Sequence, residues 1–331
     1  MKEFLLLLTT SIVSILLLFV FLELVSFCLN PIVKLSHGQV GLGIGGKDAL
    51  EYSSGYIKDR ELFWKLDPSC EEYNSLGFRD KEISPHKGSN TFRIICVGDS
   101  VTFGWPCKIE ETYPKVLEKL LNSHFSQKRF EVFNAGVPGY SSYQGLIWLR
   151  KDIIKYKPDL IIIYYGINDR SASNRPDNEQ KVLPEWIVRS ANYLRKFHFY
   201  KLFNKIKLYF KYPPTKENHY RAVRVPPSNF KNNLIDMKKL TEENRAKILF
   251  ISNPVLYDPG KKIVFTDRRY SPPENMLEFD IYNIFKKREK EADRFFLDDW
   301  RPYNFHLTRQ GQKILAEELF RFLIENNIVS E

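Results

Sequence analysis

The sequence predicts an α/β domain, a three-layer α/β/α arrangement around a doubly wound parallel sheet, behind an N-terminal transmembrane helix. Two observations predict the sheet. From Phe92 onward, short apolar runs alternate with segments of helical spacing, the pattern of parallel strands connected by helices. The run Asp159–Tyr165 is almost continuously apolar, which is typical of a strand covered on both faces.

The first element is an apolar segment at the N-terminus. Phe4–Leu22 contains no charged residue, and the apolar character resumes after Glu23. Roughly 20 apolar residues span a bilayer, whereas the core of a signal peptide has about 7–15. No small-x-small cleavage site follows, so we predict an uncleaved signal anchor over residues 1–29, with a cleaved signal peptide as the alternative. The short N-terminal tail favours a single-pass protein with the rest of the chain on the extracytoplasmic, periplasmic side.

Two further regions follow the anchor. Residues 30–91 are rich in Gly, Ser, Pro and charge, and we interpret them as a stalk and an N-terminal extension. Residues 92–331 form the predicted α/β domain. We expect its elements at these positions: strands at Arg93–Val97, Phe130–Phe133, Asp159–Tyr165, Lys247–Ser252 and Phe295–Leu297, and helices at Tyr113–Phe125, Ser142–Tyr156, Asn229–Glu243 and Thr308–Glu325.

Basic and apolar residues are mixed in one stretch of this domain. Trp186–Lys211 has apolar residues near helical spacing with Lys and Arg between them. Either it is a helix packed on the domain, or it is an amphipathic lid or membrane-contacting segment. The net charge of +10 favours anionic surfaces. Because no zinc-finger or RNP-like motif is present, we expect a membrane partner and no nucleic acid.

Four polar groups are expected at the carboxyl ends of strands, where open parallel sheets bind ligands. They are Ser100, the turn from Asn134 to Gly139, Asn168 with Asp169, and His306 before the last helix. A serine hydroxyl needs an adjacent base, for which histidine is the usual residue. An oxyanion needs preorganised donors. The backbone N–H groups of Ser100 and Gly139 and the Asn168 amide are the candidates for this oxyanion hole.

These blocks resemble those of the SGNH, or GDSL, hydrolase family. Gly98-Asp99-Ser100 matches its nucleophile block, Gly139 its oxyanion glycine, Asn168 its oxyanion amide, and His306 its catalytic base. Gly77-Phe78-Arg79 and the segment from Arg224 to Pro227 look like those of membrane-anchored bacterial members. The resemblance implies a flavodoxin-like three-layer fold and ester hydrolase or acyltransferase activity. We interpret Asp99 as a structural residue of the turn.

The sequence departs from the family where the acid of the triad is expected. The family's last block has Asp three residues before the histidine, but Tyr303 stands there. Asp298 and Asp299 lie eight and seven positions before His306, and either reaches the imidazole if the intervening residues loop out. The alternatives are a backbone carbonyl that orients the imidazole, or a site that has lost activity.

We therefore predict a serine ester hydrolase with Ser100 as nucleophile and His306 as base, acting on a lipid or an acylated glycan. The alternatives are an O-acyltransferase or deacylase of cell-surface glycan, or an impaired domain that only binds. The four cysteines form no CxxC motif or Cys/His cluster, so we expect no metal and no cofactor. A disulfide between Cys70 and Cys107 is compatible with an oxidising compartment.

Overall fold

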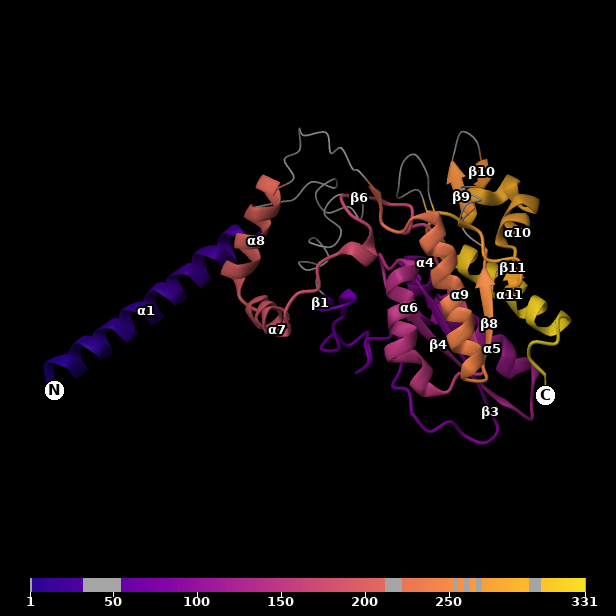
Figure 1. Cartoon of the computed structure of the whole chain (residues 1–331), viewed down its shortest axis with the longest axis horizontal. Coiled ribbons are helices and arrows are strands. Elements are labelled where there is room, and N and C mark those ends of the chain that lie inside the picture. The colour runs from indigo at the N-terminus through magenta and orange to yellow at the C-terminus, as the bar shows by residue number, and fades with distance from the viewer. Residues whose placement is uncertain are drawn as a thin grey trace. The chain divides into compact units, whose positions relative to one another are not determined.

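The computed structural model describes residues 2–31, 55–211, 222–252, 255–258, 262–265, 270–297 and 305–330. The chain divides into two compact units, Met1–Trp64 with Lys181–His219, and Lys65–Gln180 with Tyr220–Glu331 (Figure 1). They are described separately below. The boundaries expected after residues 29 and 91 stay predictions.

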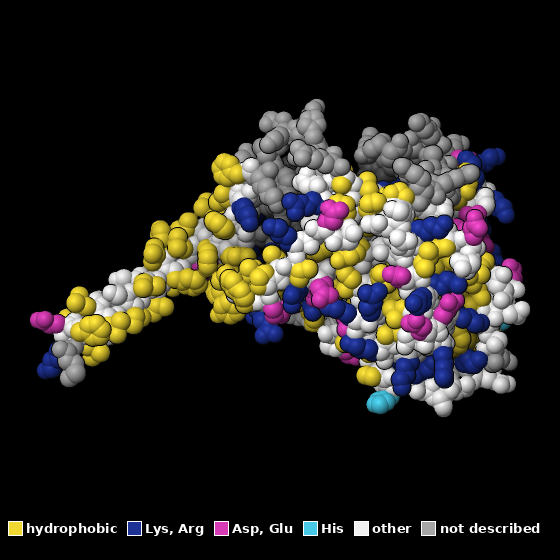
Figure 2. All heavy atoms as spheres, in the orientation of Figure 1, with side chains coloured by type: hydrophobic (Ala, Val, Ile, Leu, Met, Phe, Trp, Pro, Cys, Tyr) yellow, Lys and Arg dark blue, Asp and Glu magenta, His cyan; other side chains and the backbone are white. Residues whose placement is uncertain are grey.

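The first unit is built around one long helix. Helix α1 (Lys2–Leu29) is long and apolar enough to cross a membrane, and it alone meets that criterion among the described residues. Figure 2 shows apolar side chains over most of its length. The unit also contains β1 (Tyr56–Asp59), β2 (Phe63–Leu66) as far as Trp64, and two amphipathic helices, α7 (Glu185–Leu194) and α8 (His198–Lys211).

The second unit contains a five-stranded sheet in the order β11-β8-β5-β3-β4, and every adjacent pair is parallel. Strand β3 has β4 on one side and β5 on the other. Successive strands are therefore added on one side of β3 first and on its other side afterwards. Such a change in strand order is the place where open parallel sheets bind ligands. The strands are β3 (Thr91–Gly98), β4 (Arg129–Gly136), β5 (Leu160–Tyr164), β8 (Lys247–Ile251) and β11 (Glu278–Phe279).

Helices cover both faces of this sheet. Side chains alternate between the faces of a strand: Ile94 and Cys96 of β3 join a core with α5 and α11, whereas Ile95 and Val97 are buried toward the other face. Helices α6 and α9 contact each other (Figure 1). The helices of this unit are α4 (Ser100–Phe103), α5 (Tyr113–His124), α6 (Ser142–Lys151), α9 (Pro227–Glu243), α10 (Ile281–Lys287) and α11 (Arg309–Glu325), with 3₁₀ turns η1 (Ile109–Glu111), η2 (Ile153–Tyr156), η3 (Asp177–Glu179) and η5 (Glu289–Arg294).

Two small antiparallel pairs complete this unit. Strands β6 (Ala172–Ser173) and β7 (Ala222–Val223) form one pair, and β9 (Val255–Asp258) and β10 (Lys262–Phe265) form the other.

The predicted three-layer fold is confirmed, but one predicted strand is wrong. Phe295–Leu297 does not join the sheet: only Phe296 forms an isolated antiparallel bridge, to Leu307. The fifth strand is β11, whose two residues are too few for periodicity to reveal. Trp186–Lys211 forms two helices instead of one. Cys70 and Cys107, both within the described residues, do not form a disulfide.

Gly136 at the end of β4 is expected not to tolerate a side chain. A Cβ there would lie 2.6 Å from the carbonyl carbon of Thr102 and would also clash with the Phe103 amide, both in α4. We expect Gly136→Ala to lower the free energy of unfolding by about 1–3 kcal/mol, the usual cost of overpacking. Urea denaturation should detect this, while Gly88→Ala, at an exposed position whose nearest neighbour is the side chain of Thr91, should change stability by less than about 0.5 kcal/mol. Equal stability of both variants would contradict the prediction.

Candidate active site

Ser100 stands at the junction between β3 and α4. Asp99 is the N-cap of α4, and its Oδ1 accepts a hydrogen bond from the backbone N–H of Val101 at 2.9 Å. This contact supports the interpretation of Asp99 as a residue of the turn. Gly104, with φ of +83°, ends the helix after one turn. The side chain of Ser100 is thereby fixed at the carboxyl end of a central strand, where it is 3% exposed.

His306 is held by a short antiparallel contact. The N–H of Leu297 donates to the carbonyl of His306, and the N–H of Thr308 donates to that of Phe295, both at 2.9 Å. The Thr308 hydroxyl then caps α11 by accepting from the N–H of Gly311 at 3.2 Å. Phe295–Leu297, which was expected to be a strand of the sheet, therefore holds the loop that carries His306.

A hydrogen bond joins the two side chains that the sequence singled out. Nε2 of His306 lies 2.8 Å from Oγ of Ser100, although the residues are 206 positions apart. Both are almost fully buried. Two aromatic rings flank the imidazole: Phe305, with ring centroids 4.3 Å apart, and Trp105, at 5.2 Å. Trp105 is 45% exposed and therefore borders the pair on the solvent side.

Gly139 occupies a tight turn after β4. The N–H of Tyr140 donates to the carbonyl of Val137 at 3.1 Å, and Gly139 has φ of +81°. Proline at the second position and glycine at the third position of such a turn match a type II turn, which requires positive φ at the glycine. Asn134, earlier in the same block, accepts from the N–H of Gly136 at 3.0 Å and so stabilises the strand end.

A buried arginine holds this turn from behind. Nη1 of Arg224 donates to the carbonyl of Gly139 at 2.6 Å. Its Nη2 donates to Oδ2 of Asp177 at 2.8 Å and to Oε1 of Gln144 at 2.6 Å. Asp177 also accepts from the Ser141 hydroxyl at 2.8 Å. Arg224 and Asp177 are both almost fully buried, so their charges balance each other next to the candidate oxyanion glycine.

Asn168 and Asp169 follow β5. Nδ2 of Asn168 donates to the carbonyl of Tyr140 at 3.1 Å and to Oδ2 of Asp99 at 3.3 Å. Oδ1 of Asp169 accepts from the N–H and the hydroxyl of Ser142, at 2.9 and 2.5 Å. Its Oδ2 is buried with no hydrogen-bond partner among the described residues. These contacts tie the ends of β3, β4 and β5 together.

Burial raises the pKa of both carboxyls at these strand ends. Loss of solvation is the main cause, and it raises the pKa of Asp99 to about 7 and that of Asp169 to about 6. The bond from Val101 lowers the pKa of Asp99, while the charge of Asp169 raises it further. The bonds from Ser142 lower the pKa of Asp169.

These shifts predict an unusual dependence of stability on pH. The ordinary pKa of aspartate is 3.8, so between about pH 4 and pH 6 the folded chain retains a proton on Asp169 that the unfolded chain has lost. The contribution of Asp169 to the free energy of unfolding therefore falls as the pH rises through this window. Asp169→Asn keeps the acceptor for Ser142 and removes the titration. Urea midpoints at pH 4, 5 and 6 should fall less steeply for this variant, and parallel curves would refute the assignment.

The structure leaves one part of the predicted site open. Asp298 and Asp299 lie outside the described residues, as does Tyr303, so the orienting acid stays a prediction. Sequence reasoning did not assign Arg224 or Trp105 to the site. Arg224 ends the stretch Arg195–Arg224, which contains nine Lys or Arg and a single acidic residue, and this charge gave no sign of burial. The only signal for Trp105 was its nearness to Ser100.

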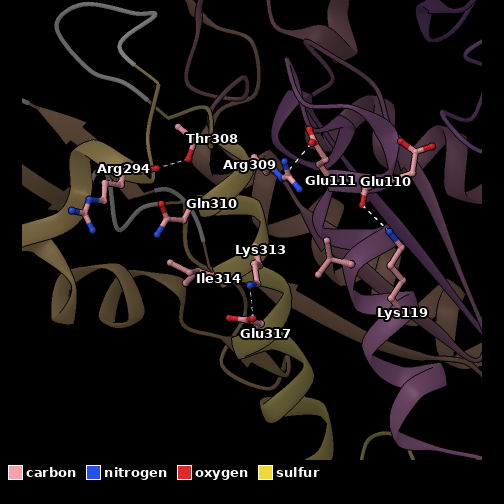
Figure 3. Close-up of a pocket in the computed structure, with 11 residues that line it drawn as sticks. Glu110, Glu111, Lys119, Arg294, Thr308, Arg309, Gln310, Lys313, Ile314 and Glu317 are labelled. Atoms are coloured by element: carbon pink, nitrogen blue, oxygen red, sulfur yellow. Dashed lines mark hydrogen bonds and ion pairs between the residues drawn. The ribbon is translucent and has the colours of Figure 1, made fainter.

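A surface cavity of about 830 Å³ lies beside the start of α11 (Figure 3). Arg309 and Lys313 of α11 line it together with Glu110 and Glu111 of η1. Nε of Arg309 is 3.3 Å from Oε1 of Glu111. Neither Ser100 nor His306 lines this cavity. Because both acidic and basic side chains line it, the cavity does not favour a ligand of either charge.

Part of the chain is similar to a known protein family. Residues 96–249 match the model of the GDSL-like Lipase/Acylhydrolase family. The match includes Ser100, Gly139 and Asn168 and ends before His306. Over these residues, just under half of the chain, the sequence is similar to this family of lipases and acylhydrolases.

Two curated relatives resemble parts of the chain. An acetylxylan esterase of Xylanibacter ruminicola is 30% identical over 103 residues, or 29% of this chain and 20% of that protein. An arylesterase of Vibrio mimicus is 30% identical over 77 residues, or 23% of this chain and 38% of that protein. The chain thus spans less than half the length of either relative.

Solved structures that match part of the chain include a lipase/acylhydrolase from Enterococcus faecalis. It is 18% identical with a TM-score of 0.44, covering 71% of this chain and 96% of that one. The acetyl xylan esterase AlAXEase is 16% identical with a TM-score of 0.43, covering 70% of this chain and 100% of that one.

Proposed function

We propose that this protein is a serine-dependent carboxylic ester hydrolase that forms a covalent acyl-enzyme. The 2.8 Å hydrogen bond between Nε2 of His306 and Oγ of Ser100 is the observation that carries this proposal. A serine hydroxyl is a weak nucleophile until an adjacent base removes its proton. The similarity of residues 96–249 to the GDSL-like Lipase/Acylhydrolase family adds support, because lipases and acylhydrolases act on ester bonds.

The reaction follows from the positions of these groups. Oγ of Ser100 attacks the ester carbonyl carbon while Nε2 of His306 takes the hydroxyl proton. The tetrahedral intermediate collapses to an acyl-serine as His306 gives this proton to the leaving alcohol. Water then attacks the acyl-serine with His306 again as base, which releases the acid and restores the hydroxyl. Nδ1 must carry the other imidazole proton, and Asp298 or Asp299 is the proposed acceptor for it.

The backbone N–H groups of Ser100 and Gly139 and the Asn168 amide are the proposed donors to the oxyanion. Such donors act best when their positions are fixed before the reaction. The carbonyl of Gly139 is fixed by Arg224. Both N–H bonds of the Asn168 amide already have acceptors, the longer to Asp99 at 3.3 Å. To bind the oxyanion, Asn168 would redirect this longer and weaker bond.

Trp105 gives a reason to prefer an acylated glycan over a lipid as substrate. His306 must protonate the leaving alcohol, and the half-exposed indole of Trp105 lies next to its imidazole. A flat aromatic ring beside the leaving group suits the apolar face of a sugar. The acetylxylan esterase relative points to the same substrate class. With α1 as a membrane anchor, the domain would act on exported polymer on the extracytoplasmic side.

A serine-reactive fluorophosphonate tests this assignment on the full chain in mild detergent. We expect one adduct per chain, found on Ser100 by peptide mass spectrometry, and no adduct in Ser100→Ala. The exposed Ser89 offers a matched control, and Ser89→Ala should label as the wild type does. Ester hydrolysis without an adduct on Ser100 would reject this nucleophile.

A further inference from the structure

Helix α1 has polar residues near its C-terminal end. Glu23 and Ser26 lie three positions apart, and Asn30 follows four positions later, so all three share one side of a helical path. Ser26 is buried and the other two are half-buried, whereas the leucines, isoleucines and valines of α1 are exposed. A polar stripe on an otherwise lipid-like helix indicates a protein contact on that side.

Helix α8 makes that contact. Oε1 of Glu23 accepts from the N–H of His198 at 2.6 Å, and Oε2 accepts from the N–H of Phe199 at 3.1 Å. The first N–H groups of a helix have no partners within it, and its N-terminus attracts negative charge. The carboxylate of α1 therefore caps α8 and is itself neutralised in part, which reduces the cost of placing it near lipid.

Two further kinds of contact hold α8 against α1. Nδ2 of Asn30 donates to the carbonyl of His198 at 2.9 Å, and Nζ of Lys205 donates to the carbonyl of Asn30 at 2.7 Å. The ring of Phe19 meets those of Phe197 and Phe199 edge-on, with centroids 5.4 and 5.7 Å apart. Helix α8 is thus fixed to the last third of α1.

The outer side of α8 is apolar and exposed. Phe203, Ile206 and Phe210 recur three and four positions apart, which places them on one face, and Phe203 is 63% exposed. Trp186 of α7 is 69% exposed and Tyr193 is also exposed. In Figure 2, apolar side chains cover α1 and continue over α7 and α8 beside its end.

We propose that α7 and α8 form a second membrane contact, in which the apolar face of α8 rests in the boundary layer of the bilayer that α1 spans. The occupant of this face is lipid, because α8 is fixed beside a helix whose own surface is lipid-like. Tryptophan and tyrosine are enriched at that boundary. Anionic headgroups would surround three lysines that neighbour these apolar residues in the sequence, Lys196, Lys201 and Lys207. This proposal depends on α1 as an anchor and is independent of ester hydrolysis.

Lipid photocrosslinking of the full chain tests the contact. The photoreactive residue p-benzoylphenylalanine replaces Phe203, and the protein is reconstituted in vesicles of phosphatidylcholine with 30% phosphatidylglycerol (roughly the charge of an anionic leaflet). Leu16 of α1 is the positive control site. Ile235 of α9, an exposed apolar side chain on the second unit, is the negative control site.

We expect the yield of lipid adducts at Phe203 to approach that at Leu16 and to exceed that at Ile235 about tenfold. Adducts at Leu16 with only the Ile235 level at Phe203 would overturn the membrane contact of α8. Background levels at both Leu16 and Phe203 would overturn the proposal as well, because α1 would then not lie in lipid. Hydrolysis of a p-nitrophenyl ester is measured on the same samples, so loss of the proposed activity is seen separately.

A charge variant tests the headgroup part of the proposal. Each lysine near an anionic surface changes lipid affinity by about fivefold. In Lys201→Gln with Lys207→Gln, the ratio of phosphatidylglycerol to phosphatidylcholine adducts at Phe203 should fall severalfold. An unchanged ratio would show that these lysines do not select anionic lipid and would overturn that part.

Discussion

Ser100→Ala should lower kcat/KM for a short p-nitrophenyl ester by at least about three orders of magnitude. That loss corresponds to about 4 kcal/mol of transition-state stabilisation. The physical reason is the loss of the covalent route: without Oγ, His306 has no hydroxyl to activate, and only direct attack by water remains. The measurement is initial-rate hydrolysis by the full chain in detergent.

Three controls separate this loss from an effect on folding. Ser100→Ala removes a single oxygen and should leave the urea midpoint unchanged. His306→Ala should lose about as much activity, and the double variant should lose little more than either single variant, because the two residues act as one unit. The exposed substitution Ser89→Ala should retain full activity. Turnover by Ser100→Ala at the wild-type rate would contradict the mechanism.

The sheet and most of its helices could be predicted because their buried residues recur with a regular spacing in the local sequence. Strand β5 is almost wholly apolar since both of its faces are covered, and α11 begins at a threonine whose hydroxyl caps it. The place of Ser100 also followed from the sequence, because parallel strands bring their carboxyl ends to one edge. His306 reaches Ser100 from a loop outside the sheet, so strand order alone did not predict that contact.

Other features depend on contacts between distant segments and left no such trace. Strand β11 has two residues and is defined only by its pairing with β8. Phe295–Leu297 had the composition of a strand, but its partner is the loop of His306 instead of the sheet. Arg224 ends the basic stretch Arg195–Arg224, whose charge suggested solvent or lipid, yet its side chain is buried and paired with Asp177, which lies 47 positions earlier.

Arg224→Met should lower the free energy of unfolding by about 3–5 kcal/mol, the range for breaking one partner of a buried ion pair. Methionine fills similar space but leaves the buried carboxylate of Asp177 without its main counter-charge. Two lesser acceptors, the carbonyl of Gly139 and Oε1 of Gln144, also lose a donor. Urea denaturation in detergent measures the change. The matched control is Arg189→Met, whose exposed pair with Glu185 should contribute less than about 1 kcal/mol.

The double variant Arg224→Met with Asp177→Leu separates charge from packing. If the uncompensated charge causes the loss, removing Asp177 as well should restore more than half of the stability. Its kcat should nevertheless stay below that of the wild type, because no guanidinium then holds the carbonyl of Gly139 and the N–H of this turn is less well placed for an oxyanion. A double variant with full stability and full kcat would mean that Arg224 stabilises the fold without positioning the oxyanion glycine. A single variant within about 1 kcal/mol of the wild type would mean that the pair is solvated and that Gly139 is held by its turn alone.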